Sequence, residues 1–132
     1  MVGQQLESVL VNEYLLTKFR TKPQWKRVRL GQAANQSEAK IYSVTLRWAD
    51  AIVISEGFVI IIEAKLRPEP GAFGQLENYK KLFPATPEFS QWKDWPIKMV
   101  LLTPKIDLNL VELATDKGID YVVFIPKGWE IK

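Results

Sequence analysis

Two apolar runs separated by a short polar turn constrain the fold of this chain more than any other feature. The runs cover residues 51–54 and 58–62, and Ser55, Glu56 and Gly57 lie between them. Runs rich in branched residues on either side of a Gly-containing pair are typical of a β-hairpin. If the two residues before Phe58 form the loop, Ser55 faces Phe58 across the ladder. Both faces of these strands are apolar, which predicts central strands that are covered on both sides.

Three charged residues lie at the open end of this hairpin. Counting outward from the loop sets Asp50 opposite Glu63, and the two-residue period of a strand adds Lys65 to the same face. Two half-buried carboxylates repel each other unless a cation lies between them. Lys65 could supply that charge in a structural ion pair. The alternative, which we favour, is a divalent metal held by both carboxylates and a backbone carbonyl, and hard oxygen ligands of this kind suit Mg²⁺.

The spacing of these residues carries a resemblance. Asp50, twelve intervening residues and then Glu63, Ala64 and Lys65 resemble the active-site signature of the PD-(D/E)xK nuclease superfamily, which includes many restriction endonucleases, Holliday junction resolvases and phage exonucleases. Ala49 stands where the signature has proline, a position that varies in the superfamily. The resemblance implies that Asp50 and Glu63 bind Mg²⁺, for which Mn²⁺ could substitute, and that Lys65 is catalytic.

The remaining elements predict an α/β fold. The length of 132 residues suits one domain, residues 1–132. Periodicity predicts helices over residues 3–19, 75–83 and 108–117, and further strands over residues 25–30, 97–103 and 119–125. Residues 67–74 read as a breaker-rich loop, and the aromatic segment 84–96 as a loop packed on the body or on a second copy. A meander followed by crossovers gives a mixed sheet with helices on both faces. This order resembles the restriction-endonuclease-like αβββαβ core.

Two helices supply further candidates. In the first helix an apolar stripe includes Leu10 and Leu16, and Glu7 lies near its start, where the helix dipole favours an acid. The resemblance implies that a Glu of this helix reaches the metal, so we prefer Glu7, with Glu13 as the alternative. Gln75, followed four residues later by Tyr79, is similar to a motif of recombination-type nucleases in which the amide orients water or phosphate. A glutamine exposed to solvent is the other interpretation.

Basic residues are concentrated before the hairpin, although the net charge is only +3. Such a segment beside a metal site suits phosphate binding. The residues expected to contact DNA are Lys18, Arg20, Lys22, Lys26, Arg27, Arg29 and Arg47. Trp25 shares a face with Arg27 and Arg29 by strand parity, which would also suit stacking on a base or sugar.

Composition narrows the chemistry. The chain has no Cys and no His, so catalysis would run on carboxylates, Lys, hydroxyls and bound metal. No apolar run reaches membrane-spanning length and no signal peptide is evident, so we expect a cytoplasmic protein. The sequence predicts a metal-dependent DNA endonuclease, acting as a homodimer because so small a chain holds one catalytic core. Recruitment by a larger recombination, repair or phage partner is also open. The alternatives are a non-catalytic DNA-binding or assembly subunit and a nuclease that acts on RNA.

Overall fold

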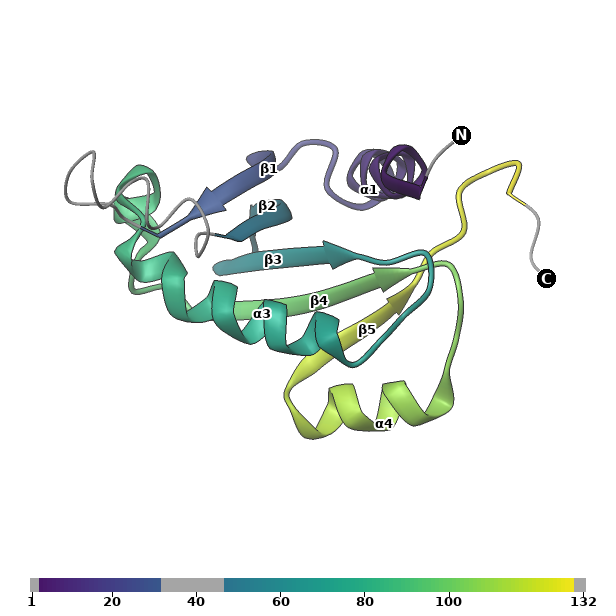
Figure 1. The fold of residues 1–132 in the computed structure, drawn as a ribbon. Helices are drawn as coiled ribbons and strands as arrows, with labels where there is room; N and C mark the ends of the chain where they lie inside the picture. Colours follow the sequence, from purple (N-terminus) through teal and green to yellow (C-terminus); the bar gives the residue numbers. More distant parts are fainter. Residues whose placement is uncertain (1–2, 32–46, 130–132) are drawn as a thin grey trace.

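The computed structural model describes residues 3–31 and 47–129 and places one mixed sheet between helices (Figure 1). Its elements are α1 (Gly3–Lys18), β1 (Gln24–Leu30), β2 (Arg47–Ser55), β3 (Phe58–Ala64), α3 (Gly71–Leu82), η1 (Phe83–Ala85), η2 (Pro87–Trp92), β4 (Ile97–Thr103), α4 (Leu108–Asp116) and β5 (Ile119–Val123). This order confirms the sequence prediction of helix, three strands, helix, strand, helix, strand. No described helix is long and apolar enough to cross a membrane.

The five strands follow one another in the sheet in chain order. β1, β2 and β3 are antiparallel neighbours, and β4 and β5 run parallel to β3. Ser55 pairs with Phe58, which confirms the two-residue loop. Both loop residues have positive φ angles, 53° at Glu56 and 82° at Gly57, as a hairpin turn that matches strand twist requires.

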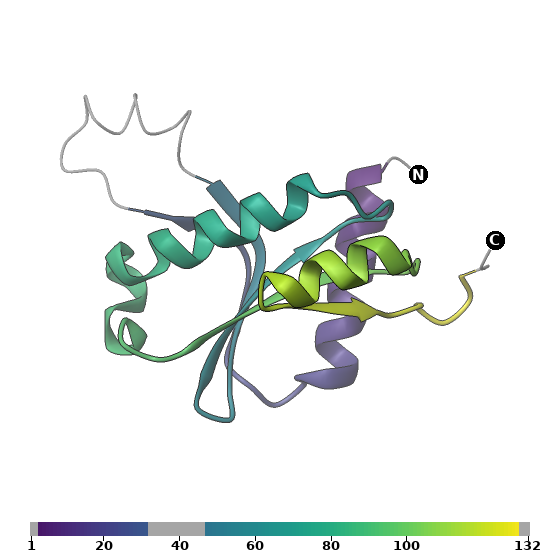
Figure 2. The same ribbon diagram turned by 90° about the horizontal axis from the view of Figure 1, so that it is seen from below.

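Helices cover both faces of the sheet, as predicted: α1 lies on one face and α3 and α4 lie on the other (Figures 1 and 2). We call the first layer the α1-side core; its buried residues are Leu10, Val11, Tyr14, Leu15, Ala51, Val53, Ile60, Ile62, Ala64, Val100 and Leu102. The α3-side core on the other face includes Val28, Ala49, Ile52, Ile54, Val59, Ile61, Phe73, Leu76, Tyr79, Phe83, Phe89 and Leu101. Both faces of β2 and β3 are therefore covered, which explains their nearly continuous apolar sequence.

The buried face of α1 differs in part from the predicted stripe. Leu16 is 58% exposed, whereas Val11 and Leu15 are buried. Tyr14 fixes this rotation of the helix, because its ring packs edge-on against both Phe19 and Phe124. Phe124 follows the last strand, so its contact with α1 could not be read from local periodicity.

The predicted loop over residues 67–74 is wrong in its second half, because α3 already begins at Gly71. Pro70 takes a helical conformation at the N-cap position, so the helix starts four residues before Gln75, where the sequence predicted its first residue. Two glycines in the first turn each cost up to about 1 kcal/mol of helix propensity. Burial of Ala72 and Phe73 in the α3-side core offsets that cost.

The aromatic segment after α3 packs on the body of the same chain. Phe89 is fully buried, and its ring lies 5.1 Å from that of Trp25 and 5.2 Å from that of Phe83. Trp92 packs on Trp25 with ring centroids 5.4 Å apart. These contacts close the end of the α3-side core next to β1.

Strand parity changes at Asp50, and this change shapes the site. Ala49 lies in the α3-side core together with Ile52, although strict alternation would put residues 49 and 52 on opposite faces. The alternation of side chains in the neighbouring strand β1 is also interrupted opposite Asp50, where Arg27 has a φ of 51°. Strict alternation would also put Trp48 on the apolar face of Ile52, but the parity change turns its side chain outward, and 51% of the residue is exposed.

Candidate active site

Asp50 is tied to β3 through its side chain. The regular pairing of β2 with β3 extends to Ala51 and Ile62. One position further out, Asp50 Oδ2 accepts a hydrogen bond of 2.7 Å from the backbone N–H of Ala64. The carboxylate thus takes the place of a ladder acceptor at the open end of the hairpin. This contact fixes the Asp50 carboxylate beside Glu63.

Glu63 is a buried carboxyl group in an unusual electrostatic setting. Only 5% of the residue is exposed, and burial is the main cause that raises its pKa from the ordinary 4.5 to about 8. The charge of Asp50 and a hydrogen bond between the two carboxyl groups raise the pKa further, whereas Lys65 and a hydrogen bond from Tyr79 lower it. In the absence of a metal, the pair therefore keeps a proton at neutral pH.

Lys65 forms an ion pair with one member of the carboxyl pair. Its Nζ is 3.8 Å from Glu63 Oε2 and 4.0 Å from Glu69 Oε1. Among the described residues, no ion pair within 4.0 Å joins Lys65 to Asp50. A hydrogen bond joins the two carboxyl groups directly, so the ammonium approaches the pair from the Glu63 side and not from between its members.

The two helices bring further polar groups toward this end of the sheet. Glu7 Oε2 accepts a hydrogen bond of 3.4 Å from the Leu66 amide. Burial raises the pKa of Glu7, while the Leu66 amide and Lys65 lower it and Asp50 and Glu69 raise it. Glu7 therefore lies within the electrostatic field of the same charged groups.

The other two candidates on helices, Glu13 and Gln75, differ in burial. Glu13 is exposed on α1. On α3, the Oε1 atom of Gln75 is buried and has no hydrogen-bond partner among the residues that the structure describes. A buried amide oxygen of this kind is rare in proteins and marks a position that can accept a hydrogen bond from water or from another donor.

Tyr79 has a polar role that the sequence analysis did not predict. The Tyr79 hydroxyl lies 3.0 Å from the carbonyl oxygen of Trp48 and 3.4 Å from Glu63 Oε1. It thereby connects α3 to the strand end that carries Asp50 and to the second carboxyl group. Its position four residues after Gln75 on the same helical face was the available signal.

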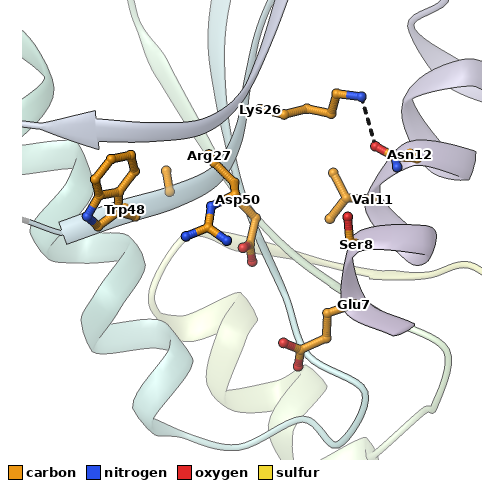
Figure 3. Close-up of a pocket in the computed structure, with 9 residues that line it drawn as sticks. Glu7, Ser8, Val11, Asn12, Lys26, Arg27, Trp48 and Asp50 are labelled. Atoms are coloured by element: carbon orange, nitrogen blue, oxygen red, sulfur yellow. Dashed lines mark hydrogen bonds between the residues drawn. The ribbon is translucent and has the colours of Figure 1, made fainter. Parts of the chain in front are cut away.

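A cleft of about 170 Å³ opens between α1 and the first two strands, next to these groups (Figure 3). It is lined by Glu7, Ser8, Val11, Asn12, Lys26, Arg27, Trp48, Ala49 and Asp50. Lys26 Nζ donates a hydrogen bond of 3.0 Å to Asn12 Oδ1 and so links β1 to α1 across the cleft. Asp50 thus belongs both to the carboxyl pair and to the wall of an open cleft.

The predicted DNA-binding residues divide into two groups. Arg27, Arg29 and Lys26 lie on β1 at the cleft side of the sheet. Lys22 instead pairs with Glu56 at the hairpin loop, with 3.2 Å between Nζ and Oε1. Glu56 lies six positions along the chain from Asp50, a span of about 20 Å in a strand.

Lys18 and Arg20 lie near the hairpin loop, like Lys22, and the Arg47 side chain can be assigned to neither group. The first two flank Phe19, which lines a pocket with residues of the hairpin loop. The structure therefore does not bring them to the carboxyl pair. The prediction for Arg47 falls on a side chain outside those that the structure describes.

Of the three predicted Mg²⁺ ligands, Asp50 and Glu63 lie together and Glu7 does not join them in one ligand set. The described residues contain no group of three acidic side chains close enough to bind one ion, so Glu7 is not brought into a single ligand set with Asp50 and Glu63. Two carboxylates with no sulfur or imidazole ligand nevertheless suit Mg²⁺, which commonly binds one or two carboxylates and keeps several waters. The chemistry of the pair fits such an ion.

Comparison with known proteins identifies the fold. No protein-family model and no curated protein matches the sequence. A repair endonuclease from Pyrococcus abyssi has a similar structure, with a TM-score of 0.55 and 13% sequence identity over 89% of this chain and 46% of that one. The endonuclease EndoMS in complex with double-stranded DNA gives a TM-score of 0.54 and 16% identity over 93% of this chain and 46% of that one.

A third similar structure, described as a protein of unknown function, has a TM-score of 0.56 and 12% identity over 88% of this chain. The chain spans about half the length of these proteins. At such low identity the likeness concerns the fold alone. The chain has the restriction-endonuclease-like nuclease fold that the sequence predicted, with a mixed five-stranded sheet flanked by helices.

Proposed function

We propose that this chain is a metal-dependent deoxyribonuclease that hydrolyses phosphodiester bonds at the end of β2 and β3. The observation that carries the proposal is the pairing of Asp50 with the buried carboxyl group of Glu63, because burial and then the charge of Asp50 raise the pKa of Glu63 to about 8 and so disfavour two carboxylates without a cation. Asp50 lines an open cleft, and two adjacent carboxyl groups of this kind suit a divalent ion.

Each residue of the site has a distinct proposed role. Asp50 and Glu63 would hold Mg²⁺ or Mn²⁺, which when bound supplies a water of lowered pKa and neutralises charge on the phosphate. Lys65, with its ammonium 3.8 Å from Glu63, would orient the attacking water or donate to a phosphoryl oxygen in the transition state. The orphaned oxygen of Gln75 would accept a hydrogen bond from water.

The proposed substrate is DNA, held by the basic side chains of β1. Lys26, Arg27 and Arg29 would contact backbone phosphates, and such contacts are largely independent of sequence. One catalytic centre cuts one strand at a time, so cleavage of both strands would use a homodimer. Since the chain spans about half of the similar endonucleases, a larger recombination, repair or phage partner would fit the same proposal.

The test is cleavage of a panel that contains supercoiled plasmid, linear duplex, four-way junction and single-stranded DNA, with Mg²⁺, Mn²⁺ or EDTA. We expect cutting that requires metal and is abolished in Glu63→Ala. The matched control is Glu69→Ala, which removes an exposed carboxylate that also lies near Lys65. No cutting of any DNA by a folded wild-type protein would overturn the nuclease proposal and favour a DNA-binding or assembly subunit.

A further inference from the structure

Trp48 is an exposed aromatic side chain on a rigid part of the backbone. Its carbonyl oxygen lies 3.0 Å from the Tyr79 hydroxyl, and its Cα pairs with that of Arg29 in the sheet. The backbone is therefore held from two sides, while 51% of the residue stays exposed. An aromatic ring whose backbone is already fixed loses little freedom when it binds a flat ligand.

Two arginines accompany this ring without covering it. The guanidinium carbons of Arg27 and Arg29 lie 5.9 Å and 6.0 Å from the centre of the Trp48 ring. These distances are at the outer limit of a cation–π contact and exceed a stacking distance, so half of the residue remains accessible. The three side chains together offer an aromatic face flanked by two positive charges, which matches a nucleobase flanked by two phosphates.

The backbone conformation of β1 at Arg27 produces this arrangement. Arg27 has a φ of 51°, a left-handed conformation that costs a residue other than glycine energy. The change of parity at this point lets Trp25 and Val28 both reach the α3-side core. It leaves Arg27 and Arg29 outside that core, beside Trp48 of the neighbouring strand.

The position of Trp48 relative to the carboxyl pair decides which nucleotide would stack. Trp48 and Asp50 both line the cleft and are two residues apart on β2, which corresponds to about 6.6 Å along the strand (Figure 3). Successive nucleotides of a duplex rise about 3.4 Å along each strand. A base on Trp48 would therefore lie within about two nucleotides of a phosphate at Asp50.

We infer that Trp48, Arg27 and Arg29 form a subsite that captures an unpaired base next to the phosphate to be cut. The inference rests on the proposed nuclease function and specifies its substrate class. A base inside a continuous duplex is already stacked on both sides and cannot stack on Trp48 without leaving the helix. The substrate is therefore DNA with unpaired nucleotides at the cleavage site, either a single strand or the single-stranded part of a duplex with an overhang.

Binding without cleavage tests the subsite separately from catalysis. Fluorescence anisotropy in EDTA would compare a labelled oligothymidine, a blunt duplex and a duplex with a single-stranded overhang. Trp48→Ala should weaken binding of the two DNAs with unpaired bases by about 5- to 150-fold and leave the blunt duplex within about twofold. Trp48→Phe should retain most of the affinity, and Trp95→Ala, at a tryptophan that is 38% exposed elsewhere, should change nothing.

Photocrosslinking of the wild-type protein makes the test independent of how any variant folds. A 5-iododeoxyuridine in the overhang should crosslink to the tryptic peptide of residues 48–65, which contains Trp48 and no other tryptophan. Crosslinks to a different peptide, or equal loss of affinity for all three DNAs in Trp48→Ala, would overturn the inference.

The outcome for the subsite and the outcome for the nuclease can be told apart. Selective binding through Trp48 by a protein that cuts nothing with metal would keep the subsite and remove the nuclease proposal. Metal-dependent cutting of blunt duplex that Trp48→Ala leaves unchanged would keep the nuclease and refute the subsite. A loss confined to the overhang DNA would identify the duplex with an overhang as the substrate, and an equal loss for oligothymidine would identify the unpaired strand itself.

Discussion

Replacement of Glu63 with glutamine should stabilise the metal-free protein, and the gain should grow as the pH rises. Glu63 has a pKa of about 8 in the folded protein and an ordinary value of 4.5, so the folded state binds more protons between these values. The wild-type protein therefore keeps its full stability below about pH 4.5 and loses stability as the pH rises through 8. Each pH unit in this window costs up to about 1.4 kcal/mol.

From about pH 5.5 to 8.5, the free energy of unfolding of Glu63→Gln should therefore rise by at most ~3 kcal/mol relative to that of the wild type. Glutamine has nearly the same shape, carries no charge and can still accept the hydrogen bond from Tyr79. Urea unfolding in EDTA at both pH values would measure the difference, with Glu69→Gln as the control for loss of an exposed carboxylate near Lys65. A difference that is constant with pH, or a variant less stable than wild type at pH 8.5, would refute this reasoning about Glu63.

Two further substitutions test contacts around the site and the fold. Tyr79→Phe removes the hydroxyl that bonds the Trp48 carbonyl and reaches Glu63. It should lower the free energy of unfolding, measured with urea at neutral pH, by about 1–3 kcal/mol. No change would mean that water replaces the hydroxyl. Asp107→Ala removes the side chain that accepts hydrogen bonds from Asn109 and Leu110 at the start of α4 and should cost about 1 kcal/mol in the same assay. An unchanged midpoint would show that this cap contributes nothing.

Much of the fold could be predicted because local signals agreed with one another. The Glu56 and Gly57 loop fixed the hairpin register, and the apolar residues on both faces of the two strands correctly predicted that both faces are covered. Asp107 caps α4 and Gly118, with a φ of 69°, follows its end, as their residue types indicated. These features depend on neighbours in sequence, which is why the sequence alone sufficed.

The surroundings of the site were harder to predict because they depend on a backbone irregularity. Neither Asp50 nor Arg27 belongs to a residue type that indicates a change of strand parity, and the change turns Trp48 away from the α3-side core and toward the cleft. The polar role of Tyr79 follows from the same irregularity, since its partner is the carbonyl of Trp48. Leu16 was misplaced for a comparable reason, because the rotation of α1 is set by Phe124 from the far end of the chain.

The most direct test of the central claim is calorimetric titration of Mn²⁺ into the wild-type protein and Glu63→Gln at pH 7, in two buffers with different heats of ionisation. A carboxyl group with a pKa near 8 is mostly protonated at pH 7, so the ion must displace that proton when it binds. The account predicts release of close to one proton per ion by the wild type, and binding at least about tenfold weaker, without proton release, in the variant. Equal Mn²⁺ binding by both proteins, or none by the wild type, would contradict a metal site built on Asp50 and Glu63.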